Sequence, residues 1–431
     1  MAFEEARTLA DLVTLVRGTT YKSALLGQPG PVLLGLASIQ RNGGFRSDSL
    51  KTYGGESKEK LLLRPGDLFV SLKDVTQSAD LLGAIARVPT EVELGRLTQD
   101  TVKLEFRDNS YPRALVYWAL RSPDFRAYCR AHATGTTNLG LPREDFLAYE
   151  LPAATSEVLS LVQFLESIEE RITLLGRINT TLEDIAQALF KSWFVDFDPV
   201  RAKAEGRAPN GMDAATAALF PSEFEDSELG PIPKGWRVDG LGEVSQNTRE
   251  QAKPEGIDPN TPYIGLEHMP RKSIALTDRG IAEGLASGKF WYRTNDILFG
   301  KLRPYFHKVG IAEGDGVCST DILVVRPISP RWFGYTAMQF SSDVVVSYAT
   351  QLSNGAKMPR TNWSDLAKYR VAMPPENVAE GFDNIIRPMI ARIHANIGAA
   401  RNLADLRDTL LPRLISGRLR LPEPASADMA A

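Results

Sequence analysis

Two long stretches of the chain carry apolar residues at the spacing of an amphipathic helix. In residues 154–195 the apolar positions follow one another in steps of mostly three and four, which form the seam of a heptad repeat. Pro152 stops the preceding segment and Thr155 or Ser156 can cap the start, so the pattern predicts a helix over 154–195. The seam consists of Val158, Leu161, Leu165, Ile168, Ile172, Leu175, Ile178, Leu182, Ile185 and Leu189.

The second stretch, residues 376–417, predicts another helix of this kind. Pro388 suits the first turn of a helix, so it weakens the prediction for the residues before it. A tail rich in Pro and Ala, 418–431, is expected to be disordered. The seam consists of Ile386, Met389 or Ile390, Ile393, Ile397, Ala400, Leu403, Leu406 and Leu410.

Apolar seams of this length favour burial, because each large side chain removed from water contributes roughly 1.5–3 kcal/mol. The simplest partner for each seam is the other one. This predicts a pair of long antiparallel coiled-coil helices of about 38 residues, each about 57 Å long. Two ordinary core helices in separate domains are the alternative.

The remaining segments, 1–153 and 236–375, mix short apolar runs with Gly, Pro, Asn and Asp, as strands and turns do. A connector rich in Pro, Gly and acidic residues, 196–235, precedes the second of them. Each mixed segment is predicted to be an α+β domain built on a curved or barrel-like sheet. Strands are expected within 31–36, 66–70, 262–266, 296–300 and 321–325, and helices within 114–121, 332–339 and 344–348.

The order mixed–helix–mixed–helix suggests an internal duplication. Residues 35–39 match 265–269, residues 65–69 match 294–298, and the apolar pattern of 182–194 matches that of 403–415. Each match is weak, but their common order predicts two similar domains in a pseudo-two-fold repeat.

Charge and composition narrow the function. The 431 residues carry 50 basic and 53 acidic side chains, which excludes a uniformly basic nucleic-acid coat but not a local basic face. Two cysteines, Cys129 and Cys318, exclude a disulfide framework and favour a cytoplasmic location. The start of the sequence lacks the apolar core of a signal peptide, and no apolar run reaches the roughly 20 residues of a membrane span.

Basic and polar residues gather on predicted loops that follow predicted strands. Arg or Lys can bind guanine, Asn can bind adenine, and Thr can contact the thymine methyl group, so these are candidate DNA-binding segments. A solvated surface loop is the alternative for each. The candidates are Arg271, Lys301, Arg303, Tyr305, Lys357 and Arg360 in the second mixed segment, and Lys73, Thr136, Asn138 and Arg143 in the first.

The sequence lacks the common signature motifs of catalysis. The sequence contains no G-x-x-x-x-G-K-[ST], no G-x-G-x-x-G, no N/D-P-P-Y/F string of an amino-methyltransferase and no nuclease-like acidic pair. The four histidines lie too far apart for metal-ligand spacing. Together with the two similar domains, this favours a binding protein without catalytic, metal-binding or cofactor-binding residues.

Several strings of the sequence resemble the specificity subunits of type I restriction–modification systems. The string 188–200, ALFKSWFVDFDPV, resembles the end of that family's central helix, and 410–419 resembles the end of its second helix. Residues 229–236 resemble the entry to its second target recognition domain, and 296–304 a strand–loop signature within it. The first domain departs from the pattern, because it lacks the Gly-Trp entry and has Lys73-Asp74 where Lys-Leu-Arg-Pro would stand.

The resemblance implies a non-catalytic DNA-reading subunit with target recognition domains at 1–153 and 236–375. Each domain would read one half of a bipartite, asymmetric site in the major groove. The paired helices would set the spacer and dock two modification subunits. Those subunits would bind S-adenosylmethionine and methylate adenine, and a restriction (translocase/nuclease) subunit would join for cleavage, so no cofactor is expected on this chain.

The helix ends are the expected partner or helix interface. The residues are Phe190, Trp193, Phe194, Leu411 and Leu414, with core packing inside the chain as the alternative. Two other functions compete with DNA reading. One is a coiled-coil scaffold that binds proteins through both mixed domains, and the other is the recognition half of a split single-chain restriction enzyme.

Overall fold

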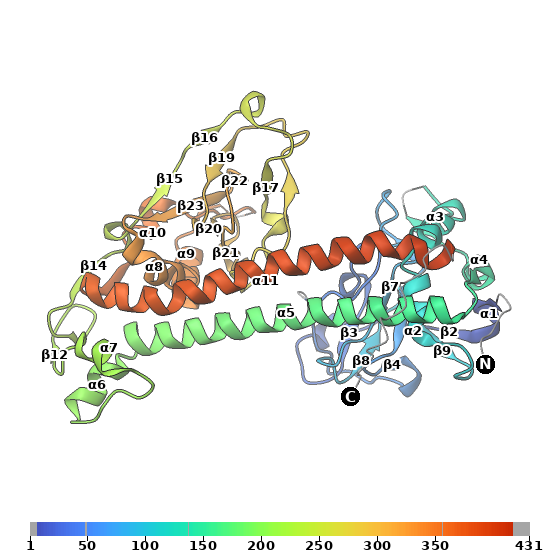
Figure 1. Ribbon diagram of the computed structural model, residues 1–431, viewed down its shortest axis with the longest axis horizontal. Helices are drawn as coiled ribbons and strands as arrows, with labels where there is room; N and C mark the ends of the chain where they lie inside the picture. Colours follow the sequence, from blue (N-terminus) through green and yellow to red (C-terminus); the bar gives the residue numbers. More distant parts are fainter. Residues whose placement is uncertain (1–6, 48–49, 137, 356, 417–431) are drawn as a thin grey trace, which may run out of the picture. The chain divides into compact units, whose positions relative to one another are not determined.

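The computed structural model describes residues 7–47, 50–136, 138–355 and 357–416, and the chain divides into two compact units. The first unit comprises the described residues up to Arg171 and those from Asn402 onward, and the second is Ile172–Arg401. Two helices, α5 (Ser156–Phe194) and α11 (Glu376–Ser416), contribute to both units (Figure 1). Within the described residues, no helix has both the length and the apolar character that spanning a bilayer requires.

Helices α5 and α11 confirm the two predicted long helices. α11 differs from the expectation at Pro388, which lies well inside the helix rather than in its first turn. A proline there removes one backbone hydrogen bond. Burial offsets this loss, because Phe382, Ile386 and Ile390 on either side of the proline are almost fully buried.

Within each unit the two helices pack against each other and run antiparallel. In the second unit Asn396 Nδ2 donates to Asn179 Oδ1 at 2.8 Å, and both amides are buried. In the first unit Arg407 donates to Glu169 Oε2 at 2.9 Å. The predicted antiparallel coiled coil is confirmed, and the alternative of two unpaired core helices is wrong.

The mixed domain of the second unit contains two packed sheets rather than one curved or barrel-like sheet. Their strand orders are β15–β23–β20–β21 and β16–β19–β22–β17–β18. In β20, Ile297 and Phe299 belong to the core shared with the helices, whereas Leu298 packs with Ile264 and Cys318 of the other sheet. Both faces of β20 are buried, so its sheet forms a middle layer. The strands are β15 (Ser245–Thr248), β16 (Gln251–Ala252), β17 (Pro262–Ile264), β18 (Gly280–Ile281), β19 (Lys289–Tyr292), β20 (Ile297–Gly300), β21 (Val309–Ile311), β22 (Gly316–Cys318) and β23 (Ile322–Pro327).

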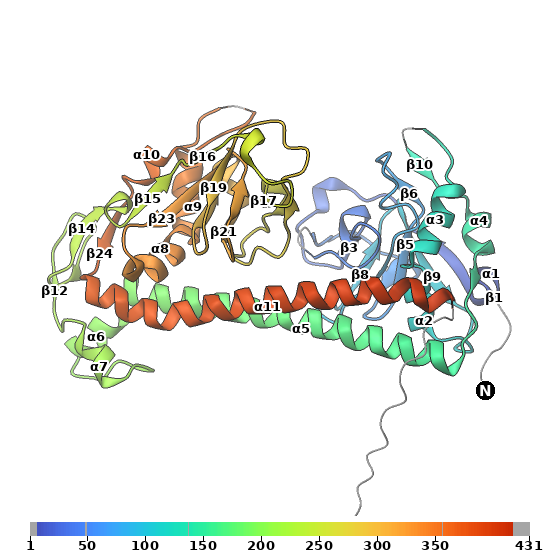
Figure 2. The same ribbon diagram turned by 45° about the horizontal axis from the view of Figure 1, so that its top comes forward.

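Helix α8 (Phe333–Phe340) lies between the middle layer and the coiled coil of this unit (Figure 2). Tyr335 contacts Phe190 and Phe194 of α5, and Phe340 contacts Phe299 of the sheet. The helices are α8 (Phe333–Phe340), α9 (Asp343–Gln351) and α10 (Trp363–Leu366); β14 (Arg237–Gly240) pairs with β24 (Arg370–Met373) where the domain begins and ends; and the connector contains α6 (Asp198–Ala204), α7 (Ala214–Ala218), β12 (Phe224–Glu225) and β13 (Ile232–Pro233).

The first unit repeats this topology. Its sheets have the orders β2–β9–β5–β7 and β3–β8–β4, and the parallel pair β3–β8 corresponds to the parallel pair β17–β22. The predicted internal repeat is therefore confirmed. The elements are β1 (Arg7–Thr8), α1 (Leu9–Leu12), β2 (Val13–Arg17), β3 (Val32–Leu34), β4 (Leu62–Leu63), β5 (Leu68–Ser71), β6 (Lys73–Asp74), β7 (Ile85–Arg87), β8 (Gly95–Leu97), β9 (Thr101–Phe106), α2 (Arg113–Ala119), α3 (Pro123–Ala131), β10 (Leu139–Gly140), α4 (Arg143–Ala148) and β11 (Glu150–Leu151).

Candidate DNA-binding surfaces

In the second unit, backbone hydrogen bonds join the two predicted basic segments. Arg303 N donates to Pro359 O at 2.7 Å, and Thr361 N donates to Lys301 O at 3.1 Å. These bonds hold the segment after β20 beside the segment after α9. Four candidates are thereby brought together: Lys301, Arg303, Lys357 and Arg360.

The side chains of this group are partly anchored. A terminal nitrogen of Arg303 donates to Lys357 O at 3.3 Å, and Arg360 Nε donates to Asp321 Oδ1 at 3.0 Å. The Nε of Arg303 is buried and has no hydrogen-bond partner among the described residues. The arginines are therefore oriented before any ligand binds, and each guanidinium still has N–H donors that can bind a ligand.

Aromatic rings lie next to this basic group. Tyr305 is 52% exposed, and its ring centroid is 4.7 Å from that of Phe306. The guanidinium of Arg271 stacks over the Phe306 ring at 4.3 Å. The structure thus places all six candidates of this domain on two loops, around 271 and 301–307, and on the adjoining segment 357–360.

The pKa of Lys301 reflects the positive charges that surround it. Burial lowers its pKa, the carboxylate of Asp321 opposes that change, and the guanidiniums of Arg249 and Arg360 lower the pKa further. Arg249, which directly follows β15, is therefore a member of the basic group that the sequence reasoning missed. A basic residue at the end of a strand was the only signal for it.

In the first unit two of the four candidates line a cavity of about 370 Å³. Lys73 and Arg143 line it, and so does Arg17, which the sequence reasoning also missed. Lys73 lies on strand β6 and Arg143 begins α4, so the expectation of loop positions is wrong for these two. Thr136 and Asn138 are exposed on the neighbouring loop and do not line the cavity.

The two surfaces occupy equivalent places in the repeat. Gly140 pairs with Lys73 in the first domain, as Arg360 pairs with Leu302 in the second. The strand registers also make Arg17 equivalent to Arg249. Arg17 directly follows the residue that pairs with Lys103, and Arg249 directly follows the residue that pairs with Val324, which takes the place of Lys103 in the repeat. Both domains therefore present one arginine at the same place, with different side chains around it.

The predicted interface residues on α5 are buried within the chain. Phe190, Trp193 and Phe194 are between 3% and 6% exposed, and their rings contact Phe382 of α11. They form an interface between the two helices and, through Trp193 and Phe220, with the connector, and they are packed inside the core of the second unit. Leu411 is likewise buried, in the core of the first unit, and the side chain of Leu414 lies outside the described residues.

Cysteine and metal chemistry find no support in the described part of the chain. Burial raises the pKa of Cys129 and of Cys318 to about 12, so neither thiol is poised to react. No group of three or more His, Cys, Asp or Glu side chains within the described ranges could hold a metal ion.

Known proteins resemble the chain in sequence. It is 23% identical over 304 residues to the type I restriction enzyme HindI specificity subunit of Haemophilus influenzae, an alignment covering 60% of this chain and 66% of that protein. For the MjaIX specificity subunit of Methanocaldococcus jannaschii the identity is 22%, with 72% and 69% of the two chains covered. For the EcoDI specificity subunit of Escherichia coli it is 25%, with 60% and 59% covered. No family model matches the chain.

The fold is also shared with a solved structure. The S subunit of a type I restriction–modification system from M. genitalium superposes with a TM-score of 0.51 at 14% sequence identity, covering 97% of this chain and 96% of that one. The sequence matches, the repeated domains and the two long helices agree. The chain is therefore similar in sequence to specificity subunits of type I restriction–modification systems, of whose length it spans about two thirds, and it shares the fold of a solved S subunit.

Proposed function

We propose that the chain is the DNA sequence-recognition subunit of a type I restriction–modification complex and performs no catalytic step itself. Each recognition domain reads one half of a bipartite site. The observation that carries the proposal is the repetition of one fold with a basic surface at the equivalent place in both copies.

The residues around these surfaces suggest which of them contact the DNA backbone and which contact bases. Arg17 and Arg249 are equivalent, so they suit a contact that both half-sites offer, such as a backbone phosphate. The neighbouring pairs differ, with Lys73 opposite Gly140 in one domain and Leu302 opposite Arg360 in the other. Different side chains at equivalent positions favour different bases, so the two half-sites should form an asymmetric sequence.

The partners are part of the same proposal. Two modification subunits dock on the chain, bind S-adenosylmethionine and methylate adenine, and a restriction subunit joins for cleavage. The paired helices set the length of the unspecified spacer, and this chain binds no cofactor. Free, buried Cys129 and Cys318 support a cytoplasmic location.

Methylation mapping tests the proposal directly. The full chain is expressed with its modification subunits in a host without other adenine methylation, and methylated adenines are located by single-molecule sequencing. We expect one bipartite, asymmetric motif that disappears when the chain is omitted. The affinity of the assembled complex should fall steeply with salt, as phosphate contacts require. Methylation without a motif, or an unchanged motif without the chain, would refute the proposal.

Arg303 offers a test at the level of one residue. Arg303→Ala in the assembled methyltransferase should weaken binding to the cognate duplex by about 1–3 kcal/mol if the guanidinium contacts a base. The backbone bond from Arg303 N to Pro359 O does not depend on the side chain, so the loop should remain in place. Arg331→Ala is the matched control, because Arg331 pairs with Glu376 and Glu380 on α11. Equal affinities for both variants would remove Arg303 from the reading surface.

A further inference from the structure

The loops that carry Arg271, Lys301 and Arg303 have an unusual backbone. Lys272, Arg303 and His307 have φ angles of 54°, 52° and 50°, in the left-handed region that side chains with a Cβ disfavour. Such conformations persist only where the surroundings hold them. What supports these two loops therefore decides where their basic side chains point.

Direct contacts join the two loops to each other and to the start of α9. Lys272 N donates to His307 O at 2.9 Å. The His307 side chain is 10% exposed, with Nε2 at 2.9 Å from Ser341 O and Nδ1 at 3.2 Å from Asp343 Oδ1. Lys272 Nζ reaches the same oxygen of Asp343 at 3.1 Å.

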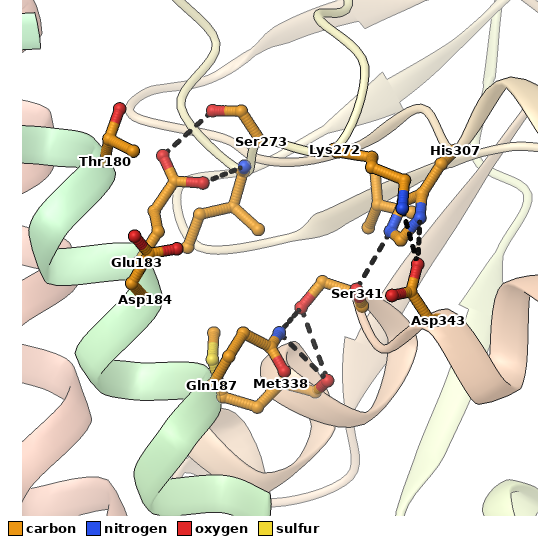
Figure 3. Close-up of a pocket in the computed structure, with 12 residues that line it drawn as sticks. Thr180, Glu183, Asp184, Gln187, Lys272, Ser273, His307, Met338, Ser341 and Asp343 are labelled. Carbon is orange, nitrogen blue, oxygen red and sulfur yellow. Dashed lines mark hydrogen bonds and ion pairs between the residues drawn. The ribbon is translucent and has the colours of Figure 1, made fainter. Parts of the chain in front are cut away.

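Helix α5 provides the second support. Glu183 accepts hydrogen bonds from Ser273 Oγ and from Ile274 N, both at 2.9 Å. One turn further on, Gln187 donates to Ser341 Oγ at 2.7 Å. Figure 3 shows the carboxylate of Glu183 directed from α5 toward the loop, across a cavity of about 300 Å³ that these residues line.

Glu183 acts there through hydrogen bonds rather than through charge. Burial raises its pKa even though Ile274 N and Ser273 Oγ favour the ionised form. The carboxyl group has lost hydration, and what it contributes is a pair of acceptors for one loop.

We propose that Glu183 is a positioning residue for the second recognition domain. From α5 it holds the loop of Arg271 in register with the loop of Lys301 and Arg303, and thereby sets base preference at the second half-site without contacting DNA. This inference rests on the proposed function.

The test compares discrimination at the two half-sites. The assembled methyltransferase is titrated with the cognate duplex and with duplexes that carry one mismatch in either half. Glu183→Ala should reduce discrimination at the second half-site about tenfold, the scale of one mispositioned base contact, and leave the first unchanged. Ser273→Ala, which removes one of the two bonds, should have a smaller effect in the same direction.

A conservative variant and a neighbour serve as controls. Glu183→Gln should behave like the parent, because the amide oxygen can accept from Ile274 N while the amide nitrogen donates to Ser273 Oγ. Asp184→Ala should also leave discrimination at both half-sites unchanged, since Asp184 lines the same cavity and is exposed.

Three results would overturn the inference. They are unchanged discrimination in Glu183→Ala, an equal loss at both half-sites, and a Glu183→Gln variant as impaired as Glu183→Ala. A parent complex that fails to discriminate at either half-site would instead refute the proposed function.

Discussion

Replacing Trp193 by alanine is expected to lower the free energy of unfolding of the second unit by about 3–5 kcal/mol, the usual range for a large aromatic residue deleted from a core. Trp193 is 3% exposed, and its ring lies 5.0 Å from that of Phe220 in the connector and 5.4 Å from that of Phe382 in α11. Three separate segments thus meet at this side chain. Helices cannot easily close around the space left behind, so the cavity should persist.

Urea denaturation followed by circular dichroism measures this effect. Trp193→Phe should lower the free energy of unfolding by less than Trp193→Ala, because it keeps an aromatic ring in the cluster. Val195→Ala is the control, since Val195 lies two residues away and is 51% exposed. A Trp193→Ala protein as stable as the Val195→Ala control would show that the aromatic cluster is not what holds this end of the helices. A folded Trp193→Phe chain should still capture the proposed modification subunits, because the buried residue has no surface to offer them.

The second large effect is expected at Glu169 in the first unit. Its carboxylate lies between two arginines, at 3.3 Å from Arg121 and 2.9 Å from Arg407, whose side chains are only 5% and 15% exposed. Glu169→Gln removes the negative charge between the two arginines and leaves Arg121 without this carboxylate, while Arg407 keeps its ion pair with Asp408 at 2.7 Å. Breaking a buried ion pair from one side costs about 3–5 kcal/mol. Thermal or urea unfolding measures the loss, and Glu170→Gln, an exposed neighbour, is the control.

The stability difference between the parent and Glu169→Gln should depend on pH in one direction. Burial alone would raise the pKa of Glu169, but Arg121 and Arg407 outweigh it, so the pKa lies below the ordinary value of 4.5. The stabilisation should therefore be complete above about pH 4.5 and be lost as the pH falls through the folded-state pKa. The gap in stability between the parent and Glu169→Gln should narrow over that acidic range. A gap that widens on acidification would contradict the role given to the carboxylate.

The sequence was informative wherever one periodicity extended over many residues. The heptad seams predicted both α5 and α11 and their pairing, because a long apolar stripe has few other ways to leave water. The proline rule failed at Pro388, where the burial of Phe382 and Ile390 outweighs one lost hydrogen bond. The short apolar runs predicted strands correctly, but they could not show that β20 is buried on both faces by two different layers.

The candidate surfaces were harder to predict than the helices. Lys301 and Arg303 stand out in the sequence because a strand, basic residues and aromatic residues follow one another closely. Arg17 and Arg249 carry no such signal, since their membership depends on strand pairing between distant segments. Trp193 is a mixed case, because the sequence string suggested a helix or partner interface and the structure buries the side chain against the connector and α11.

The buried amide pair of Asn179 and Asn396 has a consequence for how the helices can change length. A slip of one helix along the other would set each amide against hydrocarbon, which strongly favours the present alignment. The aromatic cluster around Trp193 and Phe382 is a second fixed point further along the same two helices. Residues added to only one helix between these two points would prevent the amide pair and the aromatic cluster from forming at the same time. Natural length variants should therefore carry compensating insertions in both helices, and an unmatched insertion should be selected against.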